Sequence, residues 1–276
     1  MTTKYTAPIR RVNTAKSHYY VDANGERVPG VTTILGDGIP KPALINWSAN
    51  STAEYAVDHW DELTGLSPSQ RLTKLKGARY AEKDAAANRG TEVHNLAEKL
   101  ARGEEVEVPD VLTGHIESYI QFLEDFAVRP VLLETTCMSH KYGWAGTFDG
   151  IFEFPNGLKG LPMECPRLLA DLKTNRSGIF GETALQLAGY RYADTYLDED
   201  GIEQPMLEVD GCAAVHITAD GAHLIPVVAG EAQLLQLRYA KQVAEFVKGS
   251  RDLVGAAVEP AGRTPRRRLE LVGAVA

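Results

Sequence analysis

The sequence predicts an α/β fold with a helical addition at its N-terminal end, because the pattern of apolar residues changes along the chain. Residues 42–100 are rich in Ala, Leu, Glu and Lys and contain few strand-forming residues, which favours helices. From residue 131 onward the period of the pattern becomes two, as in half-buried strands. The 276 residues, of which 44% are hydrophobic, are enough to bury one large core or two small ones.

The N-terminal segment is expected to open with a hairpin. Two β-prone runs, residues 19–21 and 31–35, flank an Asp-Ala-Asn-Gly sequence at 22–25, and Asn-Gly is a strong signal for a tight turn between strands. Several helices are expected from residue 42 to about residue 100, with a break near residues 65–69, where Gly, Ser and Pro cluster.

The remaining elements are expected to mix strands with helices, which is typical of a sheet whose faces are covered by helices. The second and third strands are joined through a Pro-Asn-Gly turn sequence at 155–157. Strands are expected over residues 131–137, 145–154, 168–174, 212–217 and 223–228, and helices over residues 111–126, 182–197 and 231–247.

The chain ends in a tail, from residue 249 onward, that is rich in Gly, Ala, Pro and Arg. Two interpretations of this tail stay open: a solvated, partly flexible terminus, or an arm that contacts phosphates. The salt dependence of DNA binding, measured with and without the tail, would distinguish them. Its clustered arginines are Arg263, Arg266, Arg267 and Arg268.

Charge and cysteine content narrow the function classes. The formal net charge of −8 argues against a protein that coats nucleic acid nonspecifically, although a local basic groove would still allow DNA binding. Cys137, Cys165 and Cys212 neither pair evenly nor show the close spacing of a zinc or iron–sulfur site, so a reducing cytoplasm fits best. No apolar run is long enough to span a bilayer, so we expect a soluble protein without a membrane partner.

Asp171 and Lys173 stand two residues apart in an otherwise apolar predicted strand. Side chains two apart on a strand point to the same face, so the carboxylate and the ammonium are expected to project together. A metal-assisted phosphodiester hydrolase needs carboxylates to hold Mg²⁺ or Mn²⁺ and a cation to orient the attacking water. The alternative is an exposed strand edge whose charges keep the sheet soluble. The apolar neighbours favour a buried site, because isolated buried charges are costly.

Asp149 is a lone acid in the preceding predicted strand, where the sequence reads Gly-Thr-Phe-Asp-Gly-Ile-Phe. If the two strands are neighbours in the sheet, Asp149 and Asp171 can converge on one ion. The backbone carbonyl of Leu172 is a further candidate ligand, since Mg²⁺ prefers oxygen donors.

These strands resemble the signature of the PD-(D/E)XK nuclease superfamily. Residues 146–149 read Gly-Thr-Phe-Asp and residues 171–174 read Asp-Leu-Lys-Thr, so Asp149 matches the first acid of the signature, and Asp171 and Lys173 match its (D/E)-x-K. Residues 90–94, Gly-Thr-Glu-Val-His, are similar to the Gly-x-x-x-His helix of the RecB-like branch, and residues 186–190, Gln-Leu-Ala-Gly-Tyr, match its Gln-x-x-x-Tyr motif. The resemblance covers about residues 89–190.

The resemblance implies a restriction-endonuclease-like core, a central mixed sheet flanked by helices, over residues 89–248. An N-terminal hairpin and helical region, residues 1–88, would pack on this core, and residues 249–276 would form the tail. It also implies that His94, together with the two aspartates and the Leu172 carbonyl, holds Mg²⁺ or Mn²⁺ while Lys173 positions the nucleophile. An ordinary position beside a helical apolar stripe is the alternative for His94.

Four further residues have weaker roles in this interpretation. Gln186 and Tyr190, four residues apart on one helix face, would reach the active site and contact DNA or its phosphate, with an ordinary packing pair as the alternative. Glu134 matches an acid often present in RecB-like members, and a solvent-facing glutamate is the alternative. Arg89 could meet a phosphate as a planar fork, or be a surface arginine.

The sequence also departs from relatives within the superfamily. The CRISPR-associated RecB-like nucleases carry four cysteines for an iron–sulfur cluster, whereas this chain has three that are wrongly placed, so we expect no cluster. The phosphate loop of a helicase motor, Gly-x-x-x-x-Gly-Lys-Ser/Thr, is absent from the sequence. The chain therefore resembles a stand-alone nuclease of the kind found in bacteriophage and prokaryotic recombination modules.

The expected activity is that of a divalent-metal-dependent DNA exonuclease in DNA recombination, DNA repair or phage DNA processing. The resemblance implies 5′-phosphate products and action on DNA ends or single strands. It also implies a recombinase or single-strand-binding protein as partner, in the cytoplasm of a bacterium or a phage-infected host. A structure-specific endonuclease on the same core and a catalytically silent DNA-binding module are the alternatives.

Overall fold

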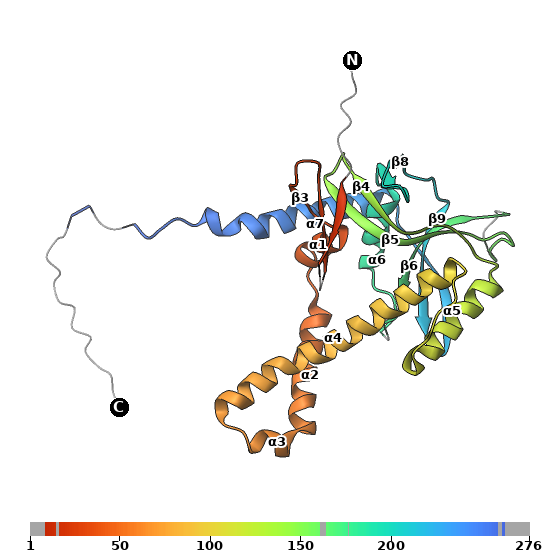
Figure 1. Cartoon of the computed structure of the whole chain (residues 1–276). Helices are drawn as coiled ribbons and strands as arrows, with labels where there is room; N and C mark the ends of the chain where they lie inside the picture. Colours follow the sequence, from red (N-terminus) through yellow and green to blue (C-terminus); the bar gives the residue numbers. More distant parts are fainter. Residues whose placement is uncertain (1–8, 15–16, 161–163, 176, 259–260, 263–276) are drawn as a thin grey trace.

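A seven-stranded mixed sheet forms the centre of the protein (Figure 1). The computed structural model describes residues 9–14, 17–160, 164–175, 177–258 and 261–262, with only the backbone described over 81–86. The strand order is β10-β9-β6-β5-β4-β7-β8. The strands are β4 (Arg129–Ser139), β5 (Trp144–Glu153), β6 (Arg167–Lys173), β7 (Thr195–Leu197), β8 (Glu203–Pro205), β9 (Gly211–Thr218) and β10 (Gly221–Val227).

Helices cover both faces of this sheet, which confirms the α/β class. The antiparallel pairs β4/β5 and β5/β6 are followed by the parallel pair β6/β9, so the sheet is mixed. One face packs on α1, α6 and α7 through a cluster that includes Trp144, Phe148 and Leu237. The other face packs on α4 and α5 through a second cluster that includes Val93 and Phe122. The helices are α1 (Val31–Gly38), α2 (Pro42–Asp58), α3 (Trp60–Thr64), α4 (Pro68–Ala101), α5 (Thr113–Asp125), α6 (Glu182–Arg191) and α7 (Glu231–Gly249), with two 3₁₀ turns, η1 (Asp110–Leu112) and η2 (Ser250–Leu253).

The N-terminal hairpin exists, but its second strand was wrongly assigned to residues 31–35. The small sheet consists of β1 (Arg10–Asn13), β2 (His18–Val21) and β3 (Arg27–Val28), and the carboxylate of Asp22 closes the turn by accepting backbone N–H groups. Residues 31–35 belong to α1 instead. Val31, Ile34 and Leu35 have helical spacing and are all buried in the main core, so packing outweighs the strand propensity of the run.

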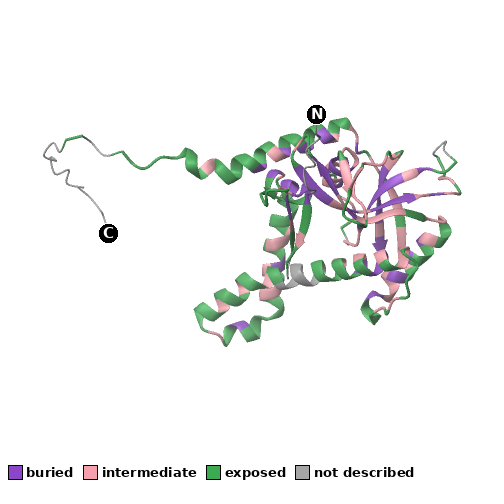
Figure 2. Cartoon of the chain, turned by 45° about the horizontal axis from the view of Figure 1, so that its top comes forward, coloured by how far each residue is buried: buried purple, intermediate pink, exposed green. Residues whose placement is uncertain are grey.

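The expected helices between residues 42 and 100 are confirmed, and they form an arm (Figures 1 and 2). We use the term helical arm for α2, α3 and the first half of α4. A capping box between Ser67 and Gln70 starts α4 at the predicted break. The helix then runs for 34 residues, through positions 88 and 89, so the boundary expected there lies within a helix. Most described residues of the helical arm are exposed.

The helix expected over residues 182–197 is shorter, because α6 ends at Arg191. Residues 195–197 form β7, which pairs with β4. The carboxylate of Asp194 accepts hydrogen bonds from the Ser139 hydroxyl and the Lys141 N–H, and the Asp194 N–H donates to the Met138 carbonyl. These contacts fix the chain in an extended conformation and stop the helix.

Two further expectations concern the C-terminal tail and membrane-spanning segments. Arg263, Arg266, Arg267 and Arg268 lie outside them, so both interpretations of the tail stay open. None of the described helices is both long enough and apolar enough to cross a membrane.

Close approach of α6 to β5 leads to a stability prediction. The indole N–H of Trp144 donates to the Gly189 carbonyl at 3.2 Å, and a Cβ atom on Gly146 would overlap the buried ring of Tyr190. Gly146→Ala should therefore lower the free energy of unfolding by about 1–3 kcal/mol, measured in urea. Gly36→Ala is the control, since its Cβ meets no atom within 4 Å and helical Ala is favourable. Equal stability of the two variants would contradict this packing.

Candidate functional site

Three neighbouring strands each carry an acid at the same level of the sheet. In the β4/β5 register Glu134 falls opposite Asp149. In the β5/β6 register Asp149 and Asp171 come one step beyond the last pair, Gly150 with Ala170. Since neighbouring strands are about 4.8 Å apart, this arrangement brings three carboxylates close together where β5 and β6 stop pairing.

His94 approaches this row from α4. Its Nδ1 lies 3.6 Å from Asp149 Oδ1. One potential ligand atom from each of His94, Glu134 and Asp149 lies within 4.8 Å of the others, and no other trio of this kind occurs among the described residues. One imidazole nitrogen with two carboxylate oxygens is a donor set that can hold a divalent cation.

Glu134, a secondary candidate in the sequence, is therefore a full member of this trio. Its φ of 44° lies in the left-handed region, which is unusual for a residue within a strand and costs of order 1–3 kcal/mol. Burial, together with the negative charge of Asp149, raises its pKa to about 7. The fold thus holds a poorly solvated carboxylate in a strained backbone position.

The pKa of Asp149 shifts in the opposite direction to that of Glu134. Burial opposes ionisation of its carboxyl group, but the hydrogen bond and charge of His94, with the Leu172 N–H, outweigh burial and lower its pKa. The Leu172 N–H donates to Asp149 Oδ2 at 2.5 Å. This contact involves the backbone N–H of Leu172, and the expected role of its carbonyl as a metal ligand stays a prediction. Burial also opposes protonation of His94, yet its hydrogen bond to Asp149 raises the pKa of the imidazole.

Asp171 and Lys173 do project together, as their spacing predicted, and they form an ion pair. Gln186 of α6 links them, since its Nε2 donates to Asp171 Oδ1 at 2.8 Å and its Oε1 accepts from Lys173 Nζ at 3.5 Å. The Gln186 amide also donates to the Tyr190 hydroxyl at 3.4 Å. Burial, with the charge of Asp149, raises the pKa of Asp171 to about 6.

The glycine of the Gly-x-x-x-His motif, Gly90 in α4, lies against the end of β6. A Cβ atom on Gly90 would lie 3.3 Å from the Thr174 hydroxyl oxygen, so the glycine allows close contact between α4 and the end of β6. Arg89 is exposed on the same helix, and no described acidic side chain forms an ion pair with it. Both interpretations of Arg89, a phosphate contact and a surface arginine, therefore stay open.

A polar group beside the acids escaped the sequence analysis. The Thr147 hydroxyl lies 2.9 Å from the Tyr20 hydroxyl, accepts from Arg11 Nη1 at 3.5 Å and lies 3.3 Å from the Thr136 hydroxyl. Arg11 is close enough for its charge to favour ionisation of Glu134. Thr147 stands two residues before Asp149, so strand periodicity could have indicated it. Arg11 gave no such signal, because it comes from a separate sheet.

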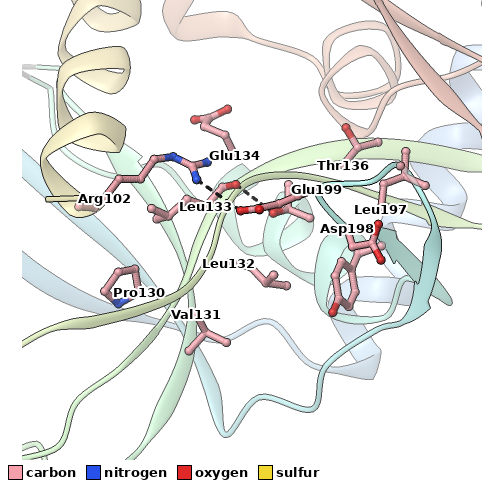
Figure 3. Close-up of a pocket in the computed structure, with 14 residues that line it drawn as sticks. Arg102, Pro130, Val131, Leu132, Leu133, Glu134, Thr136, Leu197, Asp198 and Glu199 are labelled. Carbon is pink, nitrogen blue, oxygen red and sulfur yellow. Dashed lines mark hydrogen bonds and ion pairs between the residues drawn. The ribbon is translucent and has the colours of Figure 1, made fainter. Parts of the chain in front are cut away.

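A groove of about 810 Å³ runs along β4 and reaches Glu134 (Figure 3). Arg102, at the end of α4, extends across it, with Nη1 3.8 Å from a carboxylate oxygen of Glu199. Asp198 also lines the groove. The acids outnumber the single arginine, so this groove disfavours the phosphate backbone of a nucleic acid.

No protein-family model matches the sequence, and no curated protein shows significant similarity to it. The chemistry of the site rests on its own geometry. His94, Glu134 and Asp149 form a trio whose ligand atoms could hold a divalent cation. Asp171 is not part of this trio; it follows in the next strand, paired with Lys173.

The raised pKa of Glu134 predicts how pH affects stability without metal. The folded-state pKa of about 7 exceeds the ordinary 4.5, so ionised Glu134 destabilises the fold fully above pH 7, and this penalty disappears as the pH falls toward 4.5. Glu134→Gln should therefore melt at a higher temperature than the wild type at pH 8 and at a similar temperature at pH 5. Thermal unfolding with a chelator present measures this.

The matched control is Glu105→Gln, at an exposed position of the chain. Its melting temperature should follow the wild type at both pH values. If Glu134→Gln behaved in the same way, Glu134 would be well solvated in the folded protein, which would contradict this prediction.

Proposed function

We propose that this chain is a divalent-metal-dependent DNA nuclease of the RecB-like branch of the PD-(D/E)XK superfamily, with Mg²⁺ or Mn²⁺ as its cofactor. One observation carries the proposal. Asp149 and the Asp171/Lys173 pair come together where β5 and β6 separate, and His94 closes the same site from α4. Two acids and a lysine in this arrangement fit the chemistry of phosphodiester hydrolysis.

Excess negative charge supports a cation at this position. The site holds three buried or half-buried acids, Glu134, Asp149 and Asp171. Against them stand the positive charge of Lys173 and that of His94, which is charged only when protonated. A divalent ion would favour ionisation of Glu134 and Asp171, whose pKa values are raised in its absence. When bound, Mg²⁺ or Mn²⁺ supplies an activated water and neutralises charge on the phosphate oxygens.

Lys173 would position the nucleophile, and its neighbours hold the lysine side chain in place. The Lys173 side chain is 29% exposed while the Asp171 side chain is 3% exposed, so the ammonium can reach substrate while remaining tied to the acid. Gln186 contacts both groups and Tyr190 fixes Gln186. Burial raises the pKa of Tyr190 well above its ordinary value, so its hydroxyl stays protonated. Gln186 and Tyr190 are thus positioning residues in this proposal.

DNA would approach from the side of the polar group around Thr147. Arg11 offers a planar fork of donors there, which suits a phosphate, whereas the groove along β4 is rich in acids. The partners we propose are DNA ends or single strands. Exonuclease action with 5′-phosphate products, a cytoplasmic location, a role in recombination, repair or phage DNA processing, and a recombinase or single-strand-binding partner follow from the resemblance alone.

A nuclease assay tests the proposal. End-labelled linear DNA should be degraded with Mg²⁺ or Mn²⁺ and left intact with a chelator. Asp171→Asn and Lys173→Ala should each lower the rate by about a hundredfold or more, because Asp171 would hold the metal ion and Lys173 would position the nucleophile. Asp220→Asn, at an exposed position, is the control and should keep full activity.

Activity that survives both substitutions, or that ignores chelation, would refute the site. A wild type that binds DNA but cuts no substrate would favour the silent module. Circular single-stranded DNA separates the two enzymatic alternatives, because an exonuclease leaves it intact and an endonuclease cuts it.

Calorimetry with Mn²⁺ tests the ligand role of His94. His94→Ala should weaken Mn²⁺ binding by about tenfold or more, because an inner ligand is lost. Affinity of the wild type should also fall as the pH is lowered from 8 to 6, since protons compete for Glu134. His223→Ala, an exposed histidine, is the control. Unchanged Mn²⁺ affinity in His94→Ala would make His94 a packing residue.

A further inference from the structure

Helix α7 carries two separate apolar faces. The first, with Leu237 and Ala240 at its centre, is buried against α1 and α6. The second is exposed and runs along another side of the helix, because its members follow one another at intervals of three or four residues. It consists of Leu235 (42% exposed), Tyr239 (56%), Val243 (49%), Phe246 (61%) and Val247 (54%). We call these five residues the outer stripe.

The outer stripe is unusual for the surface of a monomer. The only other long side chains along it are glutamines, Gln236 and Gln242, so it holds no charge. The second half of α7 extends away from the body of the protein, and the chain beyond it adds exposed Leu253 and Val254 (Figure 1). Exposed apolar residues of monomeric proteins are usually scattered singly, whereas these five share one side of a helix, so a partner surface is expected.

We propose that the outer stripe is a dimer interface, in which α7 packs antiparallel against α7 of a second copy of this chain. A two-fold axis would pass between Lys241 and Gln242, near the middle of the stripe. Each Tyr239 would then pack against the partner's Val243, and each Leu235 would lie near the partner's Val247. Such an isologous contact uses the same patch twice and closes after two copies.

The charges beside the stripe favour this direction of packing. Arg238 and Glu245 lie seven residues, or two turns, apart on the same flank of the stripe. About the proposed axis Arg238 faces the partner's Glu245, which gives two equivalent ion pairs. In antiparallel helices like flanks meet, whereas in a parallel pair this flank would meet the opposite one, which bears Gln236 and no charge.

The two charged groups are available for this contact. The Arg238 guanidinium lies 4.8 Å from the centre of the Tyr142 ring, a contact that uses its face and leaves N–H groups at its edge. Glu245 is exposed and forms an ion pair with Lys241 of its own helix through Oε1. Both residues are therefore held near the stripe by contacts within one copy.

The size of the contact predicts its strength. A helix of 19 residues is about 28 Å long, so a single helix pair gives an interface near or below the low end of the roughly 1,200–2,000 Å² of stable complexes. The dimer should therefore dissociate on dilution. It should also leave the candidate site open, because α7 packs on the face of α1 and α6 whereas His94 lies on α4. The proposal is independent of nuclease activity.

Sedimentation equilibrium of the full chain between about 1 and 100 µM tests the proposal. The wild type should pass from monomer to dimer over this range. Val243→Glu should remain monomeric at all concentrations, because it places a charge at the centre of the stripe. Its melting temperature should match that of the wild type, which separates loss of association from loss of folding.

A charge exchange tests the antiparallel arrangement. Arg238→Glu and Glu245→Arg should each weaken dimerisation by about tenfold, since each sets like charges against one another. The double variant should dimerise more tightly than either single variant, because the pairs between the two copies are restored with reversed signs. A wild type that is monomeric at 100 µM would overturn the proposal, as would a higher oligomer or a double variant without recovery.

A chain ending at residue 258 tests the other occupant, the C-terminal tail. Under the proposal this shortened chain dimerises like the wild type. If only the shortened chain dimerised, the tail itself would cover the stripe in the full protein, and the proposal would be wrong.

Discussion

Repulsion among Glu134, Asp149 and Asp171 is the constraint on which the site depends. Strand pairing sets the three acids at one level of the sheet, where water cannot fully screen them. Asp149 gains the His94 imidazole and a backbone N–H, and Asp171 gains Lys173 and Gln186. For Glu134, burial and the charge of Asp149 outweigh the charges of His94 and Arg11, and its pKa rises to about 7. Each acid is thus ionised to a different degree at neutral pH.

The helices on both faces of the sheet hold this arrangement. Small residues let them come close: Gly146 makes room for the Tyr190 ring of α6, and Gly90 brings α4 against the end of β6. Through Tyr190 and Gln186, the packing of α6 on β5 determines how Asp171 and Lys173 are oriented. A change in core packing therefore also changes the geometry of the site.

The sequence pattern predicted those parts of the site that lie within a single strand. Asp171 and Lys173 share one strand, so a period of two was sufficient to place them together. Glu134 and Arg11 could not be assigned in this way, because their positions depend on strand register and on a separate sheet. Residues 31–35 and 195–197 were misassigned for a related reason: short apolar or aromatic runs suit both helix and strand, and tertiary contacts decide between them.

The length of α4 has a geometric consequence. One continuous helix connects its N-cap, Ser67, with His94, and at about 1.5 Å per residue the two lie roughly 40 Å apart. An α-helix resists stretching, so α4 keeps the cluster of acids and the tip of the helical arm at a fixed distance from each other. For the DNA substrate that we propose, at about 3.4 Å per base pair, that span is slightly longer than one full turn of the double helix.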